Sequence, residues 1–178
     1  MLSRKKVIIR RFTPGLLSGY LPVSDFRHDE SLDLLDLSGR VIGVPLEGIK
    51  MVSFVRDFNT SDMVNPERLL RKTFIARPRT EGLWVRIAFT DDDILEGLAP
   101  LDISLLDEAI ADHGIQIMPP DVRGNVQRIF IPRPAMASLQ VLAVVTTPTK
   151  KKQVEMAAEE RDQQQKDLFS GMVSTRLH

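Results

Sequence analysis

The chain has 178 residues, no cysteine, and 24 basic side chains balanced by 24 acidic ones. A hydrophobic fraction of 43% is enough to form a core and excludes a wholly disordered protein. The lack of cysteine excludes disulfides and thiolate chemistry, and zero net charge argues against bulk electrostatic capture of nucleic acid or anionic membrane. The sequence contains neither a signal-peptide apolar region nor an apolar run near the roughly 20 residues of a membrane span. We therefore expect a soluble, cytoplasmic protein with no membrane partner.

The first 58 residues have the pattern of a small β-barrel. Short β-branched apolar runs alternate with turn signals such as Thr13-Pro14-Gly15 and Ser38-Gly39. We predict strands over residues 7–12, 16–21, 31–37, 40–44 and 49–55. Short strands joined by tight turns in so few residues are typical of a small closed barrel.

The same pattern returns in residues 81–147. Residues 94–100 match residues 16–22 position by position, so that Gly97 corresponds to Gly19. The paired glycines favour an internal duplication, although chance similarity between two β-rich stretches is the alternative.

The second copy is longer than the first in its middle. The stretch that begins at Ile131-Pro132 matches the one that begins at Val44-Pro45. The offset between these matching positions is nine residues larger than the offset between residues 16–22 and 94–100. Residues 104–114 explain the difference, because Ser104 fits a helix N-cap and Gly114 a helix stop. We predict a short inserted helix there.

These patterns give a mainly β fold of two tandem small barrels. The predicted parts are a first barrel (1–58), a connector (59–80), a second barrel (81–147) and a polar helical or flexible tail (148–178). Within the connector, Asn65 and Pro66 favour one or two helical turns over residues 65–72. Trp84 should begin the second barrel's first strand and pack near the interface. The predicted core is Val7, Ile9, Leu17, Leu34, Val52 and Phe54 in the first copy, and Val85, Ile87, Leu95, Ile117, Leu139 and Val141 in the second.

The first copy resembles the first motif of Sm-like barrels. The resemblance rests on the strand with Gly19 in its middle, on Asp25-Phe26, and on Leu32-Asp33-Leu34. Residues 49–58, which end in Val-Arg-Asp-Phe, are similar to the end of an uncharacterised bacterial tandem-barrel family, which implies a fold but no activity. The asparagine and the Arg-Gly pair with which Sm proteins contact RNA are missing, so RNA binding does not carry over.

No catalytic, metal-binding or cofactor motif is found, so we expect a non-enzymatic protein without cofactors. The acidic run Asp91-Asp92-Asp93 fits a solvated hairpin turn better than a metal site, because no second acidic segment converges on it. The histidines 28, 113 and 178 lack ligand spacing from one another.

The connector carries a basic cluster that is a candidate nucleic-acid contact. Phe74 lies among its members, which are Arg68, Arg71, Lys72, Arg77 and Arg79. A solvated basic face is the alternative interpretation.

The tail contains a peptide that matches a docking motif. Gln165, Asp167, Leu168 and Phe169 fit the sequence by which many bacterial replication and repair proteins bind the DNA sliding clamp. Lys166 departs from that motif, because an apolar residue is commoner there. A chance string, or packing of Leu168 and Phe169 on a barrel, is the alternative.

Charge is divided unequally along the chain. Residues 1–80 carry a net charge of about +5, whereas residues 81–147 carry about −6. Opposite charges on the two halves predict attraction between them or head-to-tail self-association. The alternative is that this unequal charge is surface variation without a function.

We therefore expect an adaptor or scaffold whose barrels bind a protein or each other and whose tail recruits a partner such as the sliding clamp. The first alternative is a nucleic-acid-binding module that uses the basic connector. The second is an enzyme or small-ligand receptor with a groove between the barrels.

Overall fold

The computed structural model describes residues 3–22, 26–28, 30–102, 105, 111–121, 123–147 and 155–166. The chain divides into two units, Met1–Val145 and Thr146–His178. In the second unit, residues 155–166 are helical and exposed. No helix among these described residues has the length and apolar character that crossing a membrane requires.

The first unit is built of β-strands, as the sequence predicts. Its strands are β1 (Arg4–Arg11), β2 (Leu16–Pro22), β3 (Arg27–His28), β4 (Ser31–Asp36), β5 (Val41–Pro45), β6 (Ile49–Val55), β7 (Gly82–Phe89), β8 (Ile94–Ala99), β9 (Gly114–Ile117), β10 (Val126–Pro132) and β11 (Met136–Val145). A single 3-10 turn, η1 (Arg133–Ala135), separates β10 from β11 in this part of the chain.

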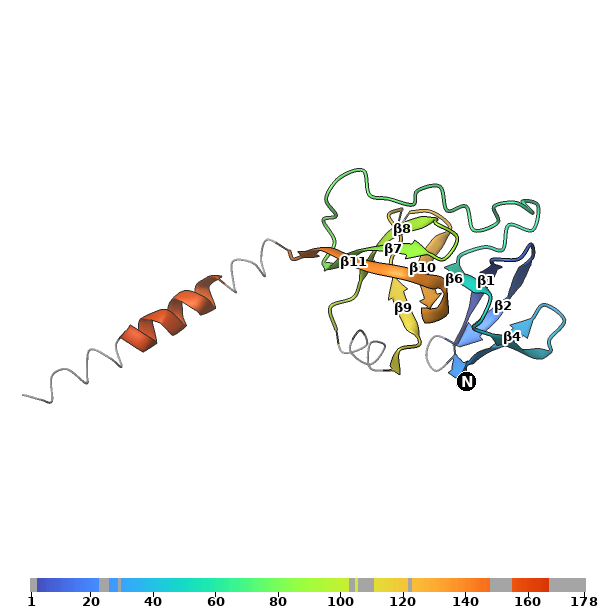
Figure 1. Cartoon of the computed structure of the whole chain (residues 1–178), viewed down its shortest axis with the longest axis horizontal. Coiled ribbons are helices and arrows are strands. Elements are labelled where there is room, and N and C mark those ends of the chain that lie inside the picture. The colour runs from blue at the N-terminus through green and yellow to red at the C-terminus, as the bar shows by residue number, and fades with distance from the viewer. Residues whose placement is uncertain are drawn as a thin grey trace, which may run out of the picture. The chain divides into compact units, whose positions relative to one another are not determined.

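The strands form two antiparallel sheets, and the larger one combines strands from both halves of the sequence (Figure 1). The larger sheet has the order β3-β4-β2-β1-β6-β10-β9, with β5 paired to β4, and the smaller has the order β11-β7-β8. The described strands do not close into a barrel, contrary to the closed barrels that the sequence predicts. The reason is that β10, from the second half, pairs with the outer edge of β6. A closed first barrel would need that edge to pair with one of its own strands.

Three central strands are buried on both faces. Ile8, Met51 and Ile129 of β1, β6 and β10 belong to one hydrophobic cluster, which also contains Val85 and Ile87 of β7. The opposite faces of the same strands contribute to a second cluster, whose members include Val7, Ile9, Val52, Phe54 and Phe130. Burial on both sides explains why runs such as residues 7–9 and 129–131 are continuously apolar rather than alternating.

Most predicted core residues are buried, but Leu139 and Val141 are not. Their side chains are 42% and 52% exposed, and Leu17 is only half-buried. Both exposed residues lie on β11, which pairs with β7 alone among the described strands. By contrast, β6 lies between β1 and β10, and Phe130 of β10 helps to bury Phe54.

The connector contains turns where the sequence predicts helix over residues 65–72. Arg68 has a φ of 51°, which interrupts a right-handed helix, and its amide closes a turn by donating to the Asn65 carbonyl (3.0 Å). In the predicted helix over 104–114, residues 105 and 111 are helical, and residues 103, 104 and 106–110 lie outside the described part.

The matched glycines Gly19 and Gly97 both lie at close approaches between strands. A Cβ on Gly97 would meet the Ile117 side chain (2.5 Å) and the Met118 carbonyl (2.9 Å), and one on Gly19 would meet Leu34 and the Leu35 carbonyl. Gly43 of β5 has no atom within 4 Å of such a Cβ. Of these three positions, only Gly97 and Gly19 therefore require the absence of a side chain.

We predict that Gly97→Ala and Gly19→Ala each lower the free energy of unfolding by about 1–3 kcal/mol, because the backbone carbonyl in each contact cannot move aside freely. Gly43→Ala is the matched control and should stay within about 1 kcal/mol of the wild type. Urea unfolding measures all three. A Gly97→Ala protein as stable as the wild type would contradict this packing.

Candidate functional site

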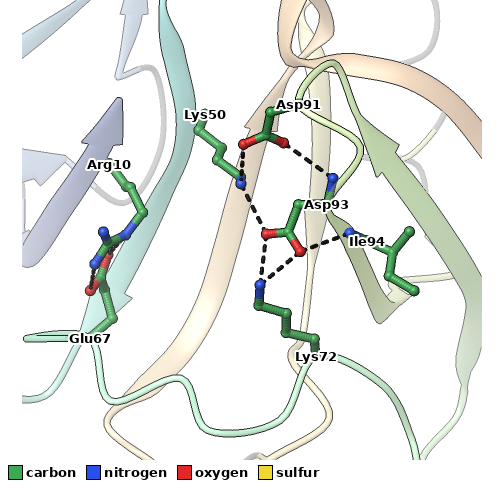
Figure 2. Close-up of polar contacts among 7 residues, drawn as sticks. All are labelled: Arg10, Lys50, Glu67, Lys72, Asp91, Asp93 and Ile94. Atoms are coloured by element: carbon green, nitrogen blue, oxygen red, sulfur yellow. Dashed lines mark hydrogen bonds and ion pairs between the residues drawn. The ribbon is translucent and has the colours of Figure 1, made fainter. Parts of the chain in front are cut away.

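Two lysines neutralise the acidic turn between β7 and β8 (Figure 2). Lys50 Nζ of β6 lies 2.6 Å from Asp91 Oδ2 and 2.9 Å from Asp93 Oδ2. Lys72 Nζ of the connector lies 2.7 Å from both carboxylate oxygens of Asp93. The turn therefore joins β6 and the connector to the second half. Among the described residues, no cluster of three acidic or histidine side chains has metal-site geometry.

Partial burial strengthens this ion-pair network. The Lys50 side chain is only 12% exposed, and its Nζ also lies 4.9 Å from the centre of the Phe89 ring. Burial alone would raise the pKa of Asp93, but hydrogen bonds from Lys72 and Lys50 outweigh it and hold the pKa below its usual value. Burial likewise acts to lower the pKa of Lys50, and the bonds to Asp91 and Asp93 reverse that effect and raise it.

A second ion pair fixes the start of the connector. Glu67, whose side chain is 1% exposed, accepts two hydrogen bonds from Arg10 of β1, from Nε (2.8 Å) and from Nη2 (2.7 Å). The bond to Glu67 raises the pKa of Arg10 against the opposing effect of burial. The neighbouring Pro66 carbonyl accepts from the side-chain amides of Asn59 (2.8 Å) and Asn125 (3.1 Å).

Glu96 fixes the end of the connector. Its carboxylate is 2% exposed and accepts from the Phe74 amide (3.0 Å), from Trp84 Nε1 (3.2 Å) and from Arg86 Nη2 (2.7 Å). Trp84 and Phe74 also pack edge to face, with ring centroids 5.8 Å apart, so Trp84 contacts the connector. No sequence motif singles out Glu96. A single charge within the apolar stretch 94–99 was the signal that could have revealed it.

The Glu96 cluster makes stability depend on pH. Burial acts to raise the pKa of Glu96, but hydrogen bonds from Phe74, Arg86 and Trp84 outweigh it, and the net pKa is below the usual 4.5. A carboxyl whose pKa is lower in the folded state stabilises the fold fully above the unfolded pKa. That stabilisation is lost as the pH falls through the folded pKa.

We predict that Glu96→Gln lowers the free energy of unfolding by about 2 kcal/mol at pH 7, because buried donors lose a charged acceptor. The difference from the wild type should shrink as the pH is lowered below 4.5. Asp92→Asn, in the adjacent turn where Asp92 is exposed, is the control and should change stability little. Urea titrations over a pH series provide the measurement, and a difference that is constant with pH would refute the assignment.

The structure gathers part of the predicted basic cluster into one groove. This groove, of about 270 Å³, is lined by Arg71, Arg77 and Arg79 together with Phe74 and the prolines 119 and 120. Its lining contains no acidic residue, and none of the three arginines forms an ion pair with another described residue. Arg68 is exposed outside the lining, and Lys72 is engaged by Asp93.

An open strand edge is the second candidate binding surface. Strand β11 is ten residues long, carries no charged side chain, and pairs only with β7 among the described strands. Leu139, Val141 and Val144 are exposed on it. A long apolar edge with unpaired main-chain groups is a template for a further strand.

An apolar groove of about 510 Å³ runs beside the start of β11. Leu83, Ile115, Met136 and Leu139 line it. Its two charged lining residues, Asp112 and Arg133, form an ion pair with each other (3.2 Å). The small-ligand or enzyme alternative stays a prediction.

The tail motif is only partly described. Gln165 is exposed within the helical residues 155–166, whereas Asp167, Leu168 and Phe169 lie outside the described residues. Docking of this segment on the sliding clamp therefore stays a prediction.

The chain matches a family of unknown function, DUF6982, over residues 3–143. It therefore belongs to that family, as the resemblance to an uncharacterised domain implies. Neither the comparison with curated proteins nor that with solved structures gave a match.

Proposed function

We propose that this protein is a non-enzymatic binding protein that captures an extended segment of a partner protein on the free edge of β11. The observation that carries the proposal is the uncharged ten-residue edge with exposed Leu139, Val141 and Val144. In strand addition, main-chain hydrogen bonds provide affinity and alternate side chains provide selectivity. The ion pairs that fix the connector hold the scaffold rigid, which lowers the ordering cost of binding.

We also propose that the two halves are copies of one Sm-like unit, left open rather than closed. In the first half the strand order is β6-β1-β2-β4-β5. In the second half it is β11-β7-β8, continued by the bridge from Leu98 to Met118 into β9 and then β10. Gly19 lies opposite Val7 and Gly97 opposite Val85, which supports the duplication inferred from the sequence.

Selection of displayed peptides on the intact protein tests the binding function. We predict that selected peptides are extended, bind the wild type, and protect backbone amides within residues 136–145 from hydrogen exchange. Val141→Lys should weaken their binding by roughly tenfold, about 1.4 kcal/mol, because it places a charge on the edge. Val64→Lys, at an exposed valine of the connector, is the control. Peptides that bind both variants equally would show that β11 is not the site.

A second candidate function is binding of single-stranded nucleic acid in the groove lined by Arg71, Arg77 and Arg79. The favouring observation is that three arginines without an ion pair to a described residue share one groove with Phe74, and that the groove lining contains no acidic residue. Arginines contact phosphates, and an aromatic ring stacks on bases.

For this candidate we predict that a labelled poly(dT) oligonucleotide binds at low salt and that Arg77→Ala/Arg79→Ala weakens binding. The slope of log K against log salt should fall by about 1.4, since each lost phosphate contact contributes about 0.7 for a single strand. Arg4→Ala/Lys5→Ala removes two exposed basic side chains elsewhere and therefore matches the change in net charge. The absence of any binding at low salt would remove this candidate.

A further inference from the structure

Among the described strands, one junction pairs a strand of the first half with a strand of the second. In this junction β10 pairs antiparallel with the outer edge of β6. The ladder places the following residues opposite each other: Arg128 and Phe54, Ile129 and Ser53, and Phe130 and Val52. The junction is well packed, because Phe130 and Val52 share a hydrophobic cluster and Arg128 lies over the Phe54 ring at 4.4 Å.

The ladder registers identify the counterparts of these two strands. Val7 of β1 lies opposite Phe54 of β6, and Val85 of β7 lies opposite Val141 of β11. Since Val7 and Val85 both lie opposite the matched glycines, β11 corresponds to β6, with Val141 in the place of Phe54.

The other strand of the junction has a counterpart in β5. Leu34 of β4 lies opposite Ile42 of β5, and Ile117 of β9 lies opposite Ile129 of β10. Leu34 and Ile117 are the residues that approach Gly19 and Gly97. Therefore β5 corresponds to β10, and Val41 takes the place of Arg128.

Both counterparts have a free edge. Among the described strands, β5 pairs with β4 alone and β11 with β7 alone. Val41 is 59% exposed, and Val141 and Leu139 are also exposed. The Arg77 side chain reaches β11 only at the Val144 carbonyl (3.5 Å), outside the segment 139–141 that the junction would use.

We infer that the occupant of the β11 edge is β5 of a second copy of this chain, so that copies join head to tail through the same junction that joins the two halves. This inference rests on the proposed function of β11 as a strand-addition site. If β5 pairs with β11 in the register in which β10 pairs with β6, the residues opposite each other are Val41 and Val141, Ile42 and Gln140, and Gly43 and Leu139. Val41 and Val141 then form an apolar cross-strand pair, and Gly43 leaves space for the Leu139 side chain.

Charge favours this pairing over a symmetric one. Strand β5 belongs to residues 1–80, with a net charge of about +5, and β11 to residues 81–147, with about −6. A head-to-tail contact brings opposite charges together, whereas pairing β11 with β11 would juxtapose two acidic halves. The contact is heterologous, so each added copy exposes a new edge and the assembly grows with concentration.

Sedimentation and light scattering of the full chain at rising concentration test the inference. The wild type should exceed the single-chain mass of 20.1 kDa as concentration rises. Val41→Lys and Val141→Lys should each stay at that mass, because each places a charge on one of the two edges. Val64→Lys should assemble as the wild type does, since Val64 is exposed but lies on neither edge.

Mixing the two edge variants is the decisive step. Val41→Lys retains an intact β11 edge and Val141→Lys an intact β5 edge, so an equimolar mixture should form a species of twice the single-chain mass and no larger. Assembly of Val41→Lys alone would instead indicate a β11–β11 contact and overturn the inference. Assembly of Val141→Lys alone would overturn it as well.

A wild type that remains monomeric at all concentrations would also overturn the inference. The peptide selection then separates the two claims. If selected peptides still protect residues 136–145, the β11 edge binds another protein and only the head-to-tail assembly fails. If they do not, the proposed function fails with it.

Discussion

The pairing of β10 with β6 is the interaction on which the rest of the structure depends. It turns β6 from an edge strand into a central one, with β1 on one side and β10 on the other. Because β6 is then buried on both faces, it contributes Met51 to one hydrophobic cluster and Val52 to the other. Neither half completes its core alone. Phe130 of the second half lies in the cluster of the first, and Ile8 and Met51 of the first half lie in the cluster of the second.

The connector adds polar constraints to this hydrophobic junction. Glu67 attaches it to β1, and Glu96 and Asp93 attach it to the second half. Each contact uses a carboxylate that accepts several hydrogen bonds, which is how a buried acid is accommodated at low cost. The connector therefore acts as a fixed part of the scaffold and presents its arginines on one groove. The two halves differ at their corresponding last strands. The outer edge of β6 pairs with β10, whereas among the described strands the outer edge of β11 has no partner.

Local sequence patterns predicted the strands and turns well, because hairpin register depends on nearby glycines and alternating residues. The sequence alone pairs Gly19 with Gly97, and the structure places both at matching close approaches. The pairing of β6 with β10 could not be predicted, since it joins residues far apart in the sequence. For that reason the sequence predicts closed barrels and places Leu139 and Val141 in a core, whereas no further strand among the described residues covers them.

The candidate site was predictable only in part. The clustering of basic residues in the sequence predicts the arginines of the groove. It also places Lys72 on the same face, whereas Lys72 forms an ion pair with Asp93. The prediction of a helix in the connector was wrong. Glu67 forms an ion pair with Arg10 of β1, and Arg68 adopts a left-handed backbone conformation that interrupts a helix. Buried ion pairs of this kind depend on tertiary contacts that a local pattern does not contain.

Native-state hydrogen exchange with urea, followed amide by amide, tests the central claim most directly. If β6 and β10 join the halves into one cooperative unit, amides of the β1–β2 and β7–β8 hairpins should exchange with the same free energy of opening. Ile129→Ala, at a buried junction residue, should lower both by the same amount, about 2–4 kcal/mol. Two separate opening free energies, with only the second half responding to Ile129→Ala, would contradict the claim.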